Sequence, residues 1–211
     1  MRDPILKEQF DTLEQQRDAA RLGLWLFLAT EFLFFGGLFM AFAVYHLVYP
    51  VGFAAAGKET NLLCGSLNAA ILLTSGLTMA LGVQALQTGS SKSSVSWMLA
   101  TFLLGAAFLG VKGMEYADDI HKHLVPGGHF AFPNQPGGQI YFWLYWIMTG
   151  LHALHLVIGL GLLAVMGWLT RRGRYSAGRN MPVVLTGVYW GFVDVIWLFL
   201  YPLLYLIDRT T

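Results

Sequence analysis

Residues 139–169 read QIYFWLYWIMTGLHALHLVIGLGLLAVMGWL and contain no Asp, Glu, Lys or Arg. A helix that crosses a bilayer needs about 20 mostly apolar residues. Apolar and polar residues do not alternate here, so a strand of a membrane barrel is excluded. Because the lipid core offers no hydrogen-bond partner to the backbone, the segment is predicted to be a transmembrane α-helix.

The rest of the chain has the same character. Hydrophobic residues make up 56 % and charged residues 12 % of its 211 residues, which excludes a disordered chain. The net charge of +1 excludes a nucleic-acid partner, and one cysteine excludes an intrachain disulfide. The predicted spans are about 22–47, 62–87, 95–116, 139–169 and 183–207.

These spans predict an all-α fold, an integral membrane bundle of five transmembrane helices in one domain, 22–207. Residues 1–21 form a polar N-terminal segment without the features of a signal peptide. The connectors, including residues 49–60 and the long 117–138 segment, are predicted to be loops because they are rich in Pro and Gly.

Lys and Arg counts predict the orientation. With the N-terminus inside, the cytoplasmic segments hold nine: Arg2, Lys7, Arg17, Arg21, Lys92, Arg171, Arg172, Arg174 and Arg179. The other side holds four: Lys58, Lys112, Lys122 and Arg209. The positive-inside rule therefore predicts a cytoplasmic N-terminus and a C-terminus on the outer side.

Four ionisable residues lie well inside the predicted spans: Glu31, His152, His155 and Asp194. Such groups cost at least about 2.5–3.5 kcal/mol at the bilayer centre and are functional candidates by default. At about 1.5 Å per residue they fall at one depth, close to that of Ser75. Residues three apart share a helix face, so both histidines point into the bundle.

We predict that His155 is the hydrogen-bond partner of Glu31. Two interpretations stay open: a buried polar network that fixes the helix register, and a proton-handling or lipid-gating role. Metal or haem ligation by the two histidines is disfavoured, because such sites need more ligands at fixed geometry.

Charged residues also mark the ends of the spans. Lys112 and Glu115 lie three apart near the predicted outer end and indicate an interfacial ion pair with a snorkelling lysine. Contact with a partner subunit is the alternative. Arg171 and Arg172 end the fourth span; they set the topology or, together with Arg21, bind anionic lipid headgroups.

His121, His123 and His129 lie in the predicted outer loop, with a spacing that matches no standard metal site. A solvated, partner-facing loop is the preferred interpretation. In the fifth span, Gly187 and Gly191 form a Gly-x-x-x-Gly pair that predicts the close approach of another helix.

Each span also carries a motif, and the five occur in a fixed order. They are Ala29-Thr30-Glu31 before an aromatic run, Ser75-Gly76-Leu77-Thr78, Gly113-Met114-Glu115-Tyr116, Thr149-Gly150-Leu151-His152-Ala153-Leu154-His155 with Gly159, and Tyr189-Trp190-Gly191-Phe192-Val193-Asp194-Val195-Ile196-Trp197. Read together, residues 21–205 resemble subunit III of the haem-copper terminal oxidases, the cytochrome c oxidase family, in its five-span bacterial form. Two residues differ from the family pattern. The family usually has histidine at the position of Gly191 and near that of Gln84 in the second span.

The resemblance implies a non-catalytic subunit of a respiratory oxidase in the bacterial plasma membrane. Such a subunit packs against subunit I, beside subunit II, in a complex that oxidises cytochrome c, reduces oxygen and translocates protons. Haem and copper lie in the partner subunits, so no catalytic residue or metal ligand is expected in this chain. The subunit binds structural phospholipid and supports proton uptake and the stability of the complex.

Individual roles follow from the same resemblance. Glu31 corresponds to the buried glutamate of the family, and Arg21 is expected to meet a lipid phosphate. His152, His155 and Asp194 are expected to complete an internal network with Glu31.

Two alternatives stay open. The first is a subunit III-like accessory subunit of a nitric oxide reductase. The second is a free-standing membrane haem protein, which would normally need an inward-facing histidine pair on another span.

Overall fold

The computed structural model describes residues 9–127, 130–131 and 137–207. Five helices in this part of the chain are long and apolar enough to cross a membrane, which confirms the predicted spans. The helices are α1 (Leu13–Val48), α2 (Pro50–Glu59), α3 (Leu62–Gln87), α4 (Ser91–His121), α5 (Gly138–Arg171) and α6 (Met181–Tyr201), followed by a short π-helix, η1 (Pro202–Leu206).

Local sequence explains where several helices begin and end. Thr12 caps α1 by accepting a hydrogen bond from the backbone N–H of Gln15 at 3.1 Å. Asn61 caps α3 in the same way, through the N–H of Cys64 at 3.2 Å. Gly89 has a φ of +90°, which is readily adopted by glycine, and it forms the tight turn between α3 and α4.

Three regions differ from the prediction. Helix α4 extends beyond the predicted span 95–116 at both ends, so residues 117–121 are helical rather than part of a loop. Residues 50–59 form helix α2 rather than a loop, because Pro50 sits in the first turn, where a missing N–H costs nothing. Phe53 of α2 is buried against Phe42 and Tyr141, and this contact stabilises the short helix. In addition, α1 begins at Leu13, so part of the predicted N-terminal segment continues the first span as one helix.

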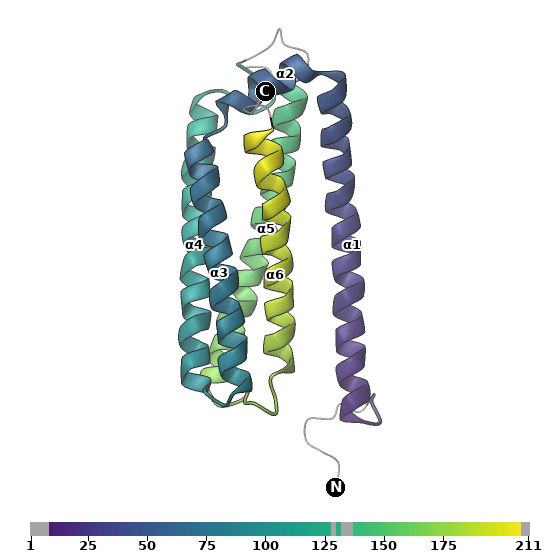
Figure 1. Cartoon of the computed structure of the whole chain (residues 1–211), viewed down its shortest axis with the longest axis vertical. Coiled ribbons are helices and arrows are strands. Elements are labelled where there is room, and N and C mark those ends of the chain that lie inside the picture. The colour runs from purple at the N-terminus through teal and green to yellow at the C-terminus, as the bar shows by residue number, and fades with distance from the viewer. Residues whose placement is uncertain (1–8, 128–129, 132–136, 208–211) are drawn as a thin grey trace.

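Helices α3 to α6 pack into a bundle, and α1 lies along one side of it, against α5 and α6 (Figure 1). Only Leu28, Phe35 and Phe42 of α1 are buried. Arg17 donates a hydrogen bond to the Gly178 carbonyl at 3.4 Å and ties the start of α1 to the α5–α6 loop. Most of the apolar surface of α1 therefore faces outward, to lipid or to another protein.

The bundle has two distinct ends (Figure 1). The start of α1, the α3–α4 turn and the α5–α6 loop lie at one end, and α2 and η1 lie at the other. An odd number of spans therefore places the start of α1 and the end of η1 at opposite ends, as predicted. That the α1 end is cytoplasmic stays a prediction.

Trp190 of α6 occupies the centre of the bundle. A Cβ on Gly105 of α4 or on Gly159 of α5 would lie within 3.0 Å of its ring, so both glycines make room for it. Gly187 packs against Val83 of α3, as the Gly-x-x-x-Gly pair predicts. Nothing in the described chain lies within 4 Å of a Cβ at Gly191, so this glycine does not serve a helix contact there.

Candidate functional site

The structure brings the polar residues predicted inside the membrane to one level of the bundle. Glu31 of α1 contacts His155 of α5, and the Tyr189 hydroxyl of α6 donates to the His155 carbonyl at 3.0 Å. One residue further along α6, Trp190 Nε1 donates to Ser75 Oγ of α3 at 3.1 Å. We call this level the mid-span layer: Glu31, Ser75, His152, His155 and Asp194.

The predicted contact between Glu31 and His155 is present. His155 Nε2 lies 3.1 Å from Glu31 Oε2, and the two side chains are 13 % and 20 % exposed. His155 Nδ1 lies 2.8 Å from the Leu151 carbonyl oxygen. Because a carbonyl only accepts, Nδ1 carries a hydrogen.

This assignment fixes the charge of the pair. An attractive contact between Nε2 and the carboxyl then requires one more proton, carried either by the imidazole or by Glu31, because without it two lone pairs would face each other at 3.1 Å. In both forms the pair has no net charge, which lowers the cost of placing it among apolar side chains. The pair is therefore a site that holds one proton at the seam between α1 and α5.

His152 has different surroundings. Its ring is fully buried between Phe108 of α4 and Trp197 of α6, with centroid distances of 5.5 and 5.0 Å. Neither ring nitrogen has a hydrogen-bond partner in the described chain. His152 and His155 line one small pocket together with Phe35, so the two rings share the inward side of α5, as predicted.

Asp194 lies on the opposite side of the layer. Its carboxylate is buried against α3, where a Cβ on Gly76 would lie only 2.5 Å from Oδ2. A larger residue at position 76 would therefore displace the Asp194 carboxylate from its present position. Neither carboxylate oxygen of Asp194 has a hydrogen-bond partner in the described residues.

Within the described chain the mid-span layer is not one continuous hydrogen-bonded network. Glu31 and His155 contact each other directly, whereas His152 and Asp194 form no hydrogen bond there. The reason is geometric, since Asp194 leaves α6 toward α3 while His155 leaves α5 toward α1. Ser75 belongs to the α3–α6 side, through Trp190. That all of them belong to one network stays a prediction.

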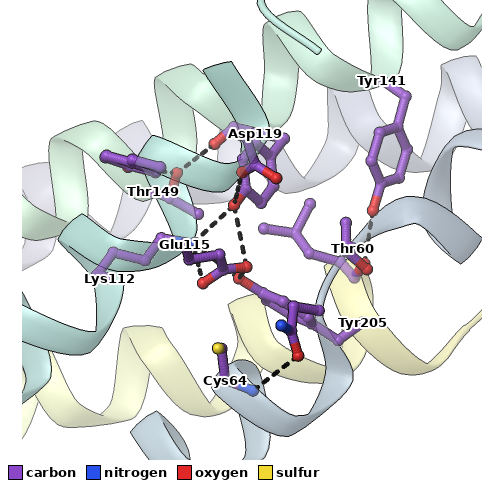
Figure 2. A network of polar contacts seen from close by, with 12 residues as sticks. Thr60, Cys64, Lys112, Glu115, Asp119, Tyr141, Thr149 and Tyr205 are labelled. Carbon is purple, nitrogen blue, oxygen red and sulfur yellow. Dashed lines mark hydrogen bonds and ion pairs between the residues drawn. The ribbon is translucent and has the colours of Figure 1, made fainter. Parts of the chain in front are cut away.

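A second polar group lies near Thr60, the residue that follows α2 (Figure 2). Lys112 Nζ donates to Glu115 Oε2 at 3.1 Å, to the Tyr145 hydroxyl at 3.0 Å and to the Tyr205 hydroxyl at 2.7 Å. The Tyr205 hydroxyl donates to Glu115 Oε1 at 2.7 Å, and the Tyr145 hydroxyl donates to Asp119 Oδ2 at 2.8 Å. We call these five residues the Lys112 cluster.

The predicted ion pair of Lys112 and Glu115 is therefore present, but it does not snorkel to the interface. The two residues are only 1 % and 2 % exposed, because the rings of Tyr145 and Tyr205 enclose the ammonium group. Sequence reasoning missed Asp119, although it lies four residues after Glu115 and shares its helix face. It also missed both tyrosines, because hydropathy does not show where a hydroxyl points.

The arginines proposed for lipid binding lie at the other end of the bundle. Arg21 is exposed, 3.7 Å from Asp18 one turn earlier in α1. Arg172 stacks on the Trp168 ring, with its guanidinium carbon 4.0 Å from the ring centroid. Arg171 is exposed at the last residue of α5.

The histidines of the predicted outer loop do not assemble a site within the described residues. His121 is the last residue of α4, and His123 follows in a left-handed turn with a φ of 56°. His129 lies outside the described residues. No group of three His, Cys, Asp or Glu side chains in the described part of the chain could hold a metal ion. Beside them, Lys122 binds Asp118 at 2.7 Å, and this hydrogen bond raises the pKa of the Lys122 ammonium.

The sequence of this chain is similar to those of known membrane oxidase subunits. A model of the family described as cytochrome c oxidase subunit III matches residues 8–208. Cytochrome c oxidase subunit 3 of Thermostichus vulcanus is 32 % identical over 203 residues, covering 94 % of this chain and 92 % of that protein. Subunit 3 of the cytochrome bo(3) ubiquinol oxidase of Pseudomonas aeruginosa is 30 % identical over 186 residues, covering 87 % and 83 %.

A third relative, quinol oxidase subunit 3 of Bacillus spizizenii, is 28 % identical over 200 residues, covering 92 % of this chain and 91 % of that protein. The match of the family model spans nearly the whole chain, all five long apolar helices included. The chain therefore belongs to the cytochrome c oxidase subunit III family.

Proposed function

We propose that this chain is the non-catalytic subunit III of a respiratory cytochrome c oxidase in a bacterial plasma membrane. Membership of the family and the five apolar helices support a membrane-bound oxidase subunit. The relatives from Thermostichus vulcanus and Synechocystis, both named cytochrome c oxidase subunit 3, support cytochrome c as the electron donor of the complex. Haem and copper belong to the partner subunits I and II.

The observation that carries the proposed role is the one-proton pair of Glu31 and His155. It lies on the only long helix of the described chain that stands beside the bundle rather than within it. A proton held there is close to the outward apolar face of α1, which we propose packs against subunit I. The pair thereby supports proton uptake by the complex and its lifetime during turnover.

Phospholipid binding is the second part of the proposal. Arg21, Arg171 and Arg172 place positive charge at the end of the bundle where α1 begins and α5 ends. Such charge near a membrane surface attracts anionic headgroups, by about 1 kcal/mol for each Lys or Arg. Lipid held there would stabilise the contact with subunit I.

A quinol oxidase is the second candidate, and the relatives from Pseudomonas aeruginosa and Bacillus spizizenii favour it. The two oxidases differ in their electron donor, which does not bind to this chain in either proposal. The mid-span layer and the Lys112 cluster therefore have the same roles in both.

The test is purification of the tagged chain in mild detergent, followed by mass spectrometry and a reduced-minus-oxidised visible spectrum. We expect a haem-copper catalytic subunit, a subunit with a copper centre, and oxygen consumption driven by reduced cytochrome c. Oxygen consumption driven by quinol alone would favour the second candidate. A nitric oxide reductase pair, or a haem spectrum from the chain alone, would contradict both.

A further inference from the structure

Tyr189 of α6 contacts both helices that carry the one-proton pair. Its hydroxyl donates to the backbone carbonyl of His155 on α5 at 3.0 Å. Its ring lies beside that of Phe27 on α1, with a centroid distance of 6.2 Å. The residue is buried, with 5 % of its surface exposed. One side chain of α6 therefore joins α5 and α1 close to the pair.

The contact with α1 lies near Glu31. Phe27 and Glu31 are four residues apart, and residues at this spacing share a face of a helix. The ring of Tyr189 therefore fixes the position of α1 one turn before the carboxyl group of the pair. Because few residues of α1 are buried, each contact of this helix with the bundle contributes much to its position.

The contact with α5 lies at the other partner of the pair. Because Nδ1 of His155 donates to the Leu151 carbonyl of the same helix, the imidazole moves together with the backbone of α5. The hydrogen bond from Tyr189 fixes this backbone at His155 itself. It thereby fixes the place from which Nε2 reaches toward α1.

The pair tolerates little displacement. His155 Nε2 and Glu31 Oε2 are 3.1 Å apart. A separation of about 3.6 Å is no longer a hydrogen bond, so a shift of roughly half an ångström between α1 and α5 would break the contact. Tyr189 opposes such a shift, because it touches both helices within one turn of the pair.

The next residue of α6 holds Tyr189 in place. Trp190 is fully buried at the centre of the bundle, and its Nε1 donates to Ser75 of α3 at 3.1 Å. Because Tyr189 and Trp190 are adjacent in one helix, the position of the tyrosine is set by the packed bundle rather than by α1. The tyrosine therefore aligns the loosely packed α1 with the bundle.

We infer that Tyr189 is a positioning residue for the one-proton pair, keeping His155 and Glu31 within hydrogen-bond distance of each other. The inference rests on the proposed role of the pair in proton uptake and goes beyond it by naming the residue that maintains its geometry. Tyr189 acts through His155 and does not exchange the proton itself.

The experiment uses the whole oxidase complex with Tyr189→Phe, which keeps the ring and removes the hydroxyl. We expect normal assembly and haem content, with turnover or active lifetime reduced roughly two- to fivefold, the factor that corresponds to one neutral hydrogen bond. The infrared absorption of the Glu31 side chain, assigned by its loss in Glu31→Gln, should shift in Tyr189→Phe because the contact with His155 lengthens.

Tyr141→Phe is the matched control. The Tyr141 hydroxyl also donates to a backbone carbonyl of another element, that of Leu204 in η1, but its ring packs against Phe53 of α2. Its removal should change neither the infrared absorption of Glu31 nor the active lifetime. Equal effects of the two tyrosine variants would overturn the inference.

A double variant separates positioning from general stability. If Tyr189 acts through the pair, Tyr189→Phe should cause no further loss of activity in the Glu31→Gln complex, whose pair no longer exchanges a proton. Additive losses in the double variant would overturn the inference. Dissociation of the subunit from the Tyr189→Phe complex, or an unshifted absorption of Glu31, would also overturn it.

The outcomes also separate this inference from the proposed function. An effect of Glu31→Gln without any effect of Tyr189→Phe would overturn the inference and leave the proposed function intact. Unchanged activity of Glu31→Gln would contradict the proposed function. In that case, an absorption of Glu31 that shifts in Tyr189→Phe and not in Tyr141→Phe would still support the positioning role.

Discussion

The Lys112 cluster and the mid-span layer are both polar groups inside an apolar bundle, but they are built differently. In the Lys112 cluster, one cation, two carboxyl groups and two tyrosine hydroxyls bind one another, all of them buried. In the mid-span layer, Glu31 and His155 bind each other, while His152 and Asp194 have no partner in the described chain.

The difference separates two uses of buried polarity. A fully bonded cluster fixes the positions of the helices that contribute to it, here α4, α5 and η1, and has no free group left to exchange a proton. A layer with partly exposed and unpartnered groups stabilises the fold less. Such groups are instead able to exchange a proton or to bind a neighbouring subunit. We therefore assign structure to the Lys112 cluster and function to the mid-span layer.

Lys112→Met should have the largest effect on stability. It leaves Glu115 and Asp119 buried without their counter-charge, and breaking a buried pair typically costs about 3–5 kcal/mol. The amount of the chain that co-purifies with the complex should fall steeply. Lys122→Met is the control, because its exposed pair with Asp118 contributes about 0.5 kcal/mol or less. Equal yields of the two variants would refute the structural role of the cluster.

Tyr205→Phe should have an intermediate effect. The variant keeps the ring but loses hydrogen bonds to Lys112 and Glu115, and bonds to charged groups contribute about 1.5–3 kcal/mol. Tyr201→Phe is the matched control, because its hydroxyl contacts only the neutral Ser66 among the described residues, and we expect about 0.5–1.5 kcal/mol. Thermal unfolding of the complex, monitored by the release of the subunit, measures the effect of both substitutions. A larger loss in Tyr201→Phe would reverse this ranking.

Gly76→Ala tests the packing of Asp194 and should cost about 1–3 kcal/mol, because the new Cβ overlaps the carboxylate. Gly110→Ala, where a Cβ meets nothing within 4 Å, should be neutral or slightly stabilising. In the double variant with Asp194→Ala, most of the loss should disappear. Additive losses in this double-mutant cycle would mean that Asp194 and Gly76 do not interact.

The sequence predicted the features that depend on one helix or on depth in the membrane. The spans follow from runs of apolar residues, and the contact of Glu31 with His155 follows from equal depth and a shared face. Helix α2 was missed because Pro50, Gly52 and Gly57 are typical of loops, although Pro50 begins the helix.

The burial of Lys112 was missed for another reason. Its partners Tyr145 and Tyr205 lie 33 and 93 residues away in the chain. Hydropathy reports an apolar environment, but lipid and protein interior are equally apolar, so it does not reveal which side of a helix is enclosed. Likewise, depth alone placed Asp194 beside His155, whereas the direction in which each side chain leaves its helix separates them.

The most direct test of the central assignment is Glu31→Gln in the purified oxidase complex, measured as turnover rate and as loss of activity during sustained turnover. Glutamine keeps the size of the side chain and a hydrogen bond to His155 but cannot exchange the proton of the pair. We predict normal assembly and haem content, with slower turnover or a shorter active lifetime. Unchanged turnover and lifetime would contradict the account and leave Glu31 and His155 with a packing role only.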